Sequence, residues 1–159
     1  MEKTLSQERV LGLINLCLQE TFEKVGGIYL DPGTSLFETL ATINAEEASQ
    51  PVSAHCASLA AQVKHVIFYI HTTERYMLTT DDFRVDWDEV WRTTLAVTPA
   101  EWQALQDELK AAYTELRQIA DDIEVWDADR PLGGIFTIIL HTAFHLGQIR
   151  EVMCVLKSS

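Results

Sequence analysis

Two histidines four residues apart, His141 and His145, are the residues of this sequence whose spacing most directly suggests chemistry. Side chains four residues apart on a helix are neighbours on one face, so two imidazoles can bind one ion. Ile138 and Ile149 make that face apolar. A buried imidazole needs partners for its ring nitrogens, and a metal ion is a common partner of neutral imidazole. The pair therefore indicates either a metal site or two hydrogen-bonded histidines in the core.

Two ligands leave most metals unsatisfied, and His65 is the best candidate for a third. It lies about two turns inside a second predicted helix, on the edge of an apolar seam. Three histidines from two helices leave a coordination position open for water or substrate, as in catalytic sites. Gln62 and Tyr69 share the face of His65, and Gln148 lies one turn from His145. These three side chains are candidates to orient the ligands or to contact substrate.

Other residues argue against several better-known sites. His55 precedes the second helix and is expected in a loop or at the surface, while His71 is rotated by about a third of a turn from His65. Thr142 stands where a His-Glu-x-x-His peptidase needs its general base. The Glu-x-x-His pairs of di-iron bundles do not occur in this sequence. A peptidase and a di-iron site are thereby excluded.

Four long helices are needed to position these residues, and apolar side chains at alternating three- and four-residue spacing predict them. Gly26 and Gly27 are expected to end the first. Thr98, Pro99 and Glu101 form the clearest start signal, a capping box with proline at the first helical position. The four helices are expected over residues 11–25, 58–78, 98–123 and 131–157.

Shorter helices are expected in the connections, at 34–40, 44–47 and 86–91, the last covering one end of the long helices. The predicted fold is therefore all-α, an antiparallel four-helix bundle with short extra helices. The length of 159 residues suits one domain, residues 1–159, with a substantial core.

Composition narrows the classes of partner. The formal net charge of −12, without clusters of Lys and Arg, argues against nucleic-acid binding. No signal peptide and no membrane span are predicted, because polar residues interrupt every long apolar run. Cys17, Cys56 and Cys154 are odd in number and lack Cys-x-x-Cys spacing, which favours a reducing cytoplasm over a disulfide framework.

The segment that contains His141 and His145, followed by Gly147, Gln148 and Ile149, resembles the last-helix signature of the DinB/YfiT-like superfamily, His-x-x-x-His-x-Gly-Gln-Ile. Residues 58–66, which contain His65, resemble the segment that carries the first histidine of that superfamily, and residues 86–92 resemble a connector of one of its branches. The resemblance covers essentially the whole chain.

The resemblance implies a DinB-like four-helix bundle with a three-histidine site for a divalent metal, often assembled as a homodimer. Zinc or nickel is expected first, with iron or manganese as alternatives. Some relatives resemble transferases that attach bacillithiol or mycothiol to electrophiles, and others are damage-inducible proteins. The leading hypothesis is therefore a cytoplasmic, metal-dependent thiol S-transferase in detoxification or the stress response.

Two other functions remain open from the sequence. The same ion can activate water instead of a thiol, which would make the protein a metal-assisted hydrolase. Alternatively, the metal has only a structural role and links two helices, and the bundle is a non-catalytic module that binds a small molecule or a protein. Elemental analysis and a screen of thiols against an electrophile separate these hypotheses.

Overall fold

The computed structural model describes residues 6–51, 53, 56–94, 96–122 and 129–158. Within these ranges all regular structure is helical and no strand occurs, so the all-α prediction is confirmed. The helices in chain order are α1 (Gln7–Phe22), α2 (Leu36–Leu40), α3 (Ala45–Ser49), α4 (Leu59–Leu78), α5 (Glu89–Thr93), α6 (Pro99–Asp122) and α7 (Asp129–Ser158).

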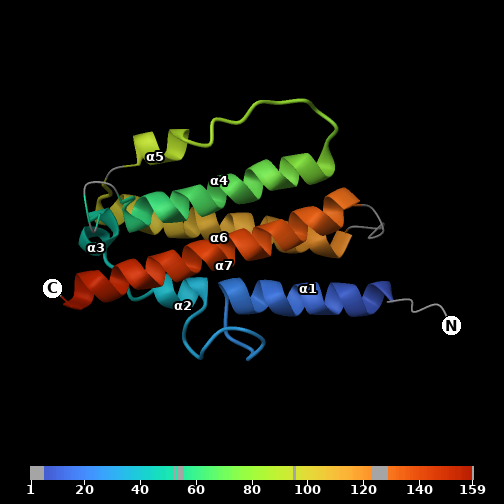
Figure 1. Cartoon of the computed structure of the whole chain (residues 1–159), viewed down its shortest axis with the longest axis horizontal. Coiled ribbons are helices and arrows are strands. Elements are labelled where there is room, and N and C mark those ends of the chain that lie inside the picture. Colours follow the sequence, from blue (N-terminus) through green and yellow to red (C-terminus); the bar gives the residue numbers. More distant parts are fainter. Residues whose placement is uncertain (1–5, 52, 54–55, 95, 123–128, 159) are drawn as a thin grey trace.

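Four long helices, α1, α4, α6 and α7, lie side by side (Figure 1). Helix α4 packs against α6 and α7, and α1 packs against the same two helices. Their inward faces are apolar and form one buried cluster, as expected from the three- and four-residue spacing. The side chains at its centre include Leu18, Phe22, Ile70, Leu109 and Ile138.

The long helices do not simply alternate in direction. Helices α4 and α7 are antiparallel, whereas α4 and α6 run the same way (Figure 1). Lys64 and Glu108 form an ion pair of 3.1 Å between the first halves of α4 and α6. The parallel pair arises because the connection after α4 returns along the helices and carries α5 before α6 begins. A short connection would instead have made α4 and α6 antiparallel neighbours.

The predicted helix starts agree well with the structure. Thr98 Oγ1 accepts a hydrogen bond from Glu101 N at 3.3 Å, and Glu101 Oε2 accepts one from Thr98 N at 2.7 Å, so the capping box of α6 is confirmed. Ser58 Oγ caps α4 by accepting from Ala61 N. The short helices expected in the connections are also present, with bounds shifted by a few residues.

The first helix ends earlier than predicted, at Phe22 rather than at the two glycines. The reason is Glu20, whose side chain is buried and accepts hydrogen bonds from the backbone N–H groups of Gly26, Ile28 and Tyr29, and of Leu30. Although burial acts to raise it, these bonds lower the pKa of Glu20 to about 2. The carboxylate thus holds the chain in a loop where periodicity alone would continue the helix.

Residues Arg130–Ser158 of α7 are long and apolar enough to cross a membrane by length and composition alone. Core helices of soluble proteins meet the same criterion. Here α7 buries Ile135, Ile138 and Ile149 against the other helices, which is the behaviour of a core helix. The absence of a membrane span stays a prediction from the sequence.

Helices α4 and α7 approach each other closely at Gly134. A Cβ atom built on Gly134 would overlap Cγ and Sδ of Met77 on α4, whereas one built on the neighbouring Gly133 would meet nothing within 4 Å. The absence of a side chain at position 134 therefore leaves room for the side chain of Met77 between the two helices. The same pair of helices supplies the histidines discussed below.

This difference gives a matched pair of substitutions. Gly133→Ala is expected to stabilise the protein by about 0.5–1 kcal/mol, because alanine is the better helix former. Gly134→Ala is expected to destabilise it by about 1–3 kcal/mol, because Met77 and its neighbours must shift to make room. Urea unfolding of the two variants measures this difference. An equal gain in stability from both substitutions would contradict the close approach of α4 and α7.

Candidate metal centre

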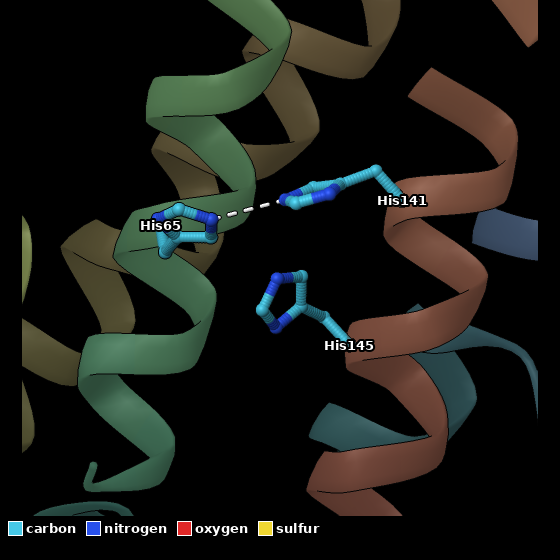
Figure 2. A group of neighbouring side chains, drawn as sticks. All are labelled: His65, His141 and His145. Carbon is cyan, nitrogen blue, oxygen red and sulfur yellow. Dashed lines mark hydrogen bonds between the residues drawn. The ribbon is translucent and has the colours of Figure 1, made fainter. Parts of the chain in front are cut away.

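The structure brings His65, His141 and His145 together between α4 and α7 (Figure 2). One potential ligand atom from each ring lies within 4.8 Å of the other two. His65 Nε2 and His141 Nε2 are 3.0 Å apart, and the ring centroids of His141 and His145 are 4.5 Å apart. The antiparallel arrangement of α4 and α7 thus allows histidines 76 and 80 residues apart in sequence from His65 to share one point.

The site lies at the edge of the core. His65 is 6% exposed and His145 is 5% exposed, while His141 is half-buried. Burial disfavours the imidazolium form, because a charge in the interior loses its hydration. It lowers the pKa of all three rings, and the neighbouring histidines add to the effect at His141 and His145, whose pKa values fall to about 4. At neutral pH the three rings are neutral, which is the form that binds metals.

Gln62 determines how His145 presents its ring. The Gln62 Oε1 atom accepts a hydrogen bond from His145 Nδ1 in the buried interior between α4 and α7. A neutral imidazole carries one ring proton, so the proton on Nδ1 leaves the lone pair of Nε2 available to an ion. Hydrogen bonds of this kind fix both the tautomer and the orientation of histidine ligands. The predicted role of Gln62 beside the ligands agrees with this geometry.

Aromatic rings pack against the other two histidines. Tyr69 stacks on His141 at 3.6 Å between centroids with an interplanar angle of 15°. Trp91 of α5 stacks on His65 at 4.3 Å and 25°. The position of Trp91 was not predicted as part of the site, although a short helix covering one end of the long helices was expected near it. The two stacked rings limit how His65 and His141 can rotate.

The donor set fits a divalent metal ion. Two nitrogens bound at about 2.0–2.1 Å to a tetrahedral zinc ion lie roughly 3.3 Å apart, close to the observed separation of His65 Nε2 and His141 Nε2. Without an ion, two neutral imidazole nitrogens at this distance can form only one N–H···N hydrogen bond. A buried group of three histidines can therefore hold a metal ion here, as expected from the sequence.

A cavity of about 560 Å³ reaches the three-histidine group at His145 and is large enough for a small molecule. His145 and Gln62 are among its lining residues, and Trp91 and Phe144 contribute apolar surface. Gln148 also lines it, and its buried Oε1 lacks a hydrogen-bond partner among the described residues. The remaining lining residues are Pro51, Cys56, Ala57, Ser58, Ala61 and Thr94.

The other histidines do not join this group. His71 is exposed on α4, and the ring group formed by His65, His141 and His145 does not include it, in agreement with its predicted rotation. The position predicted for His55, in a loop or at the surface, lies outside the described residues. Of the residues predicted around the ligands, Gln62 contacts His145, Tyr69 contacts His141, and Gln148 faces the cavity.

Comparison with protein-family models, with curated proteins and with solved structures gave no match to this chain. The geometry of the site is therefore the main ground on which a function can be argued.

The low pKa values of the buried rings predict an unusual pH profile for metal binding. Zn²⁺ affinity is expected to stay nearly constant from roughly pH 8 to about pH 5 and to fall below that, because His141 and His145 stay neutral down to about pH 4. Solvated histidines would begin to lose affinity near their ordinary pKa of about 6.5. Competition titrations with a chromophoric chelator at each pH measure this. Affinity that declines steadily below pH 7 would contradict the neutral buried triad.

Proposed function

We propose that this protein is a metal-dependent thiol S-transferase built on a four-helix bundle of the DinB/YfiT-like type. The observation that carries the proposal is the convergence of three neutral, mostly buried imidazoles, one of which, His145, also lines a cavity large enough for a small molecule. Three protein ligands leave room for an exogenous ligand on the ion, which is what a catalytic site requires. The sequence resemblance of the last helix supports the choice of a thiol as that ligand.

The metal would be held by the Nε2 atoms of His65 and His141 and by the ring of His145. Zinc or nickel is the ion we propose, since both suit imidazole ligands and need no redox partner for this chemistry. When bound, such an ion lowers the pKa of a thiol in its open position, so that thiolate forms near neutral pH. Gln62 and Trp91 would keep the ligand rings in place through the contacts described above.

The substrates would meet in the adjoining cavity. The thiol proton is released to solvent, the thiolate sulfur forms a bond to an electrophilic carbon, and the leaving group departs with its bonding electrons. Phe144 and Trp91 offer apolar surface to the electrophile, and the amide of Gln148, which lines the cavity, can accept a hydrogen bond from an N–H or O–H group of the thiol substrate. Low-molecular-weight thiols such as bacillithiol or mycothiol carry such groups.

The proposal predicts metal-dependent transfer of a small thiol. Purified protein loaded with Zn²⁺ or Ni²⁺ is expected to accelerate the reaction of a panel of thiols with a chromogenic electrophile, and chelation should abolish the acceleration. His145→Ala is expected to lose the bound metal and at least about 100-fold in rate, because a missing ligand opens the site. Elemental analysis and initial rates on the same samples check both effects.

Matched controls separate this reaction from chemistry of the protein's own thiols. Cys56 is exposed and lines the cavity, so Cys56→Ser should retain bound metal and the dependence of turnover on added thiol. Cys154 is exposed and is not among the lining residues, so Cys154→Ser is the matched control and should leave metal content and rate unchanged. Bound metal without turnover for any thiol would overturn the transferase and favour a stapled, non-catalytic module. Metal-dependent hydrolysis of an ester in the absence of thiol would favour a hydrolase instead.

We further propose a cytoplasmic homodimer that forms along α7. Phe136, Leu140 and Phe144 follow one another at four-residue spacing on α7 and are 40%, 68% and 61% exposed, so they form a continuous apolar stripe. Phe144 belongs both to this stripe and to the cavity wall, which would place the partner beside the substrates.

A charge in the stripe should break such a dimer. Leu140→Glu is expected to shift the protein from dimer to monomer, because a carboxylate cannot be buried without a partner. Leu78→Glu is the matched control, since Leu78 is 60% exposed at the end of α4, outside the stripe. Sedimentation velocity of the two variants measures the effect. A wild-type monomer, or equal behaviour of both variants, would contradict the dimer.

A further inference from the structure

A second group of possible ligands lies between α4 and α6, apart from the three histidines. Because these helices run in the same direction, residues seven positions beyond the Lys64–Glu108 ion pair meet again, and they are His71 and Glu115. Glu74 lies three residues after His71, on the same face of α4. One ligand atom from each of His71, Glu74 and Glu115 lies within 4.8 Å of the other two.

Glu74 is the member of this group that needs an explanation. Its side chain is only 7% exposed, and its buried Oε1 has no hydrogen-bond partner among the described residues. Leaving a carboxylate buried and unsatisfied is costly. The contrast with Glu20 is direct, since that equally buried carboxylate accepts hydrogen bonds from four backbone amides. Glu74 therefore needs a compensating charge or a proton.

The neighbour of Glu74 increases this need. Burial, together with the negative charge of Glu115, raises the pKa of Glu74 to about 7. A cation placed between the two carboxylates would relieve both the repulsion and the unsatisfied oxygen. The third member of the group, the His71 imidazole, is exposed and offers a nitrogen ligand to such a cation.

We propose that His71, Glu74 and Glu115 bind a divalent transition-metal ion, Zn²⁺ being the type case, at a site separate from the three-histidine centre. One imidazole nitrogen with two carboxylates is a donor set for zinc-like ions, whereas Mg²⁺ and Ca²⁺ prefer oxygen ligands alone. His71 and Glu115 are exposed, so the ion can enter from solvent and complete its coordination with water. The ion would link α4 to α6 by one ligand pair on α4 and one ligand on α6.

This site does not depend on the proposed transferase activity. It would contribute to stability, because an ion that binds only the folded chain shifts the equilibrium toward the folded state. The sequence contains its signal, a His-x-x-Glu spacing at residues 71–74. That spacing does not predict a metal site from the sequence alone, because the third ligand, Glu115, lies 41 residues beyond Glu74 on another helix.

Metal stoichiometry and affinity test the site. Equilibrium dialysis against Zn²⁺, with elemental analysis, is expected to give two ions for each wild-type chain and one for the His141→Ala/His145→Ala double variant. Glu115→Gln in that double variant should weaken the remaining Zn²⁺ by at least about tenfold. Glu108→Gln is the matched control, because Glu108 occupies the same face of α6 one heptad earlier and forms an ion pair with Lys64. It should leave Zn²⁺ binding unchanged.

Two results would overturn the second site. One is a double variant that binds no Zn²⁺ while remaining folded, and the other is equal Zn²⁺ binding by the Glu115→Gln and Glu108→Gln variants. If the double variant does not fold, Glu115→Gln and Glu108→Gln are each made in the otherwise wild-type chain. There, Glu115→Gln should bind one Zn²⁺ ion per chain, and Glu108→Gln should bind two. The imidazole NMR signals of His71 provide an independent measurement, since they should shift on Zn²⁺ addition in wild type and should need at least about tenfold more Zn²⁺ to shift in Glu115→Gln.

Discussion

The three-histidine group depends on the antiparallel contact between α4 and α7, which buries His65 and His145 and half-buries His141. Withdrawal from water costs a charged ring more than a neutral one, so burial itself selects the form that donates lone pairs. His145 then has a fixed tautomer because Gln62 accepts its Nδ1 proton. Further along the same pair of helices, Gly134 leaves room for the side chain of Met77. The packing of α4 against α7 therefore determines both the neutral form of the rings and the tautomer of His145.

The long connection between α4 and α6 affects both sites. It returns along the helices, so it carries Trp91 onto the ring of His65 and also makes α6 parallel to α4. The first consequence covers the three-histidine centre on one side and leaves the cavity as its access. The second places Glu115 beside His71 and Glu74. A topology with a short hairpin at this point would have produced neither arrangement.

Two buried carboxylates show how context decides the charge of the same chemical group. Backbone amides surround Glu20, and they stabilise its ionised form so strongly that burial does not raise its pKa. Glu74 has no comparable donors for Oε1 and faces another carboxylate, so the same burial raises its pKa instead. The carboxylate of Glu20 thus holds a loop, whereas the carboxylate of Glu74 lies in surroundings that favour a bound cation.

The sequence by itself determined the helical class, most helix starts and the identity of His65, His141 and His145 as candidates, because helical periodicity and capping are local properties. Local patterns did not reveal the early end of α1, since Glu20 reaches six to ten residues along the chain to its amide donors. Nor did they reveal Trp91 over His65 or Glu115 beside His71. Those contacts depend on the direction of α6 and the path of its connection, which only the packing of the whole chain decides.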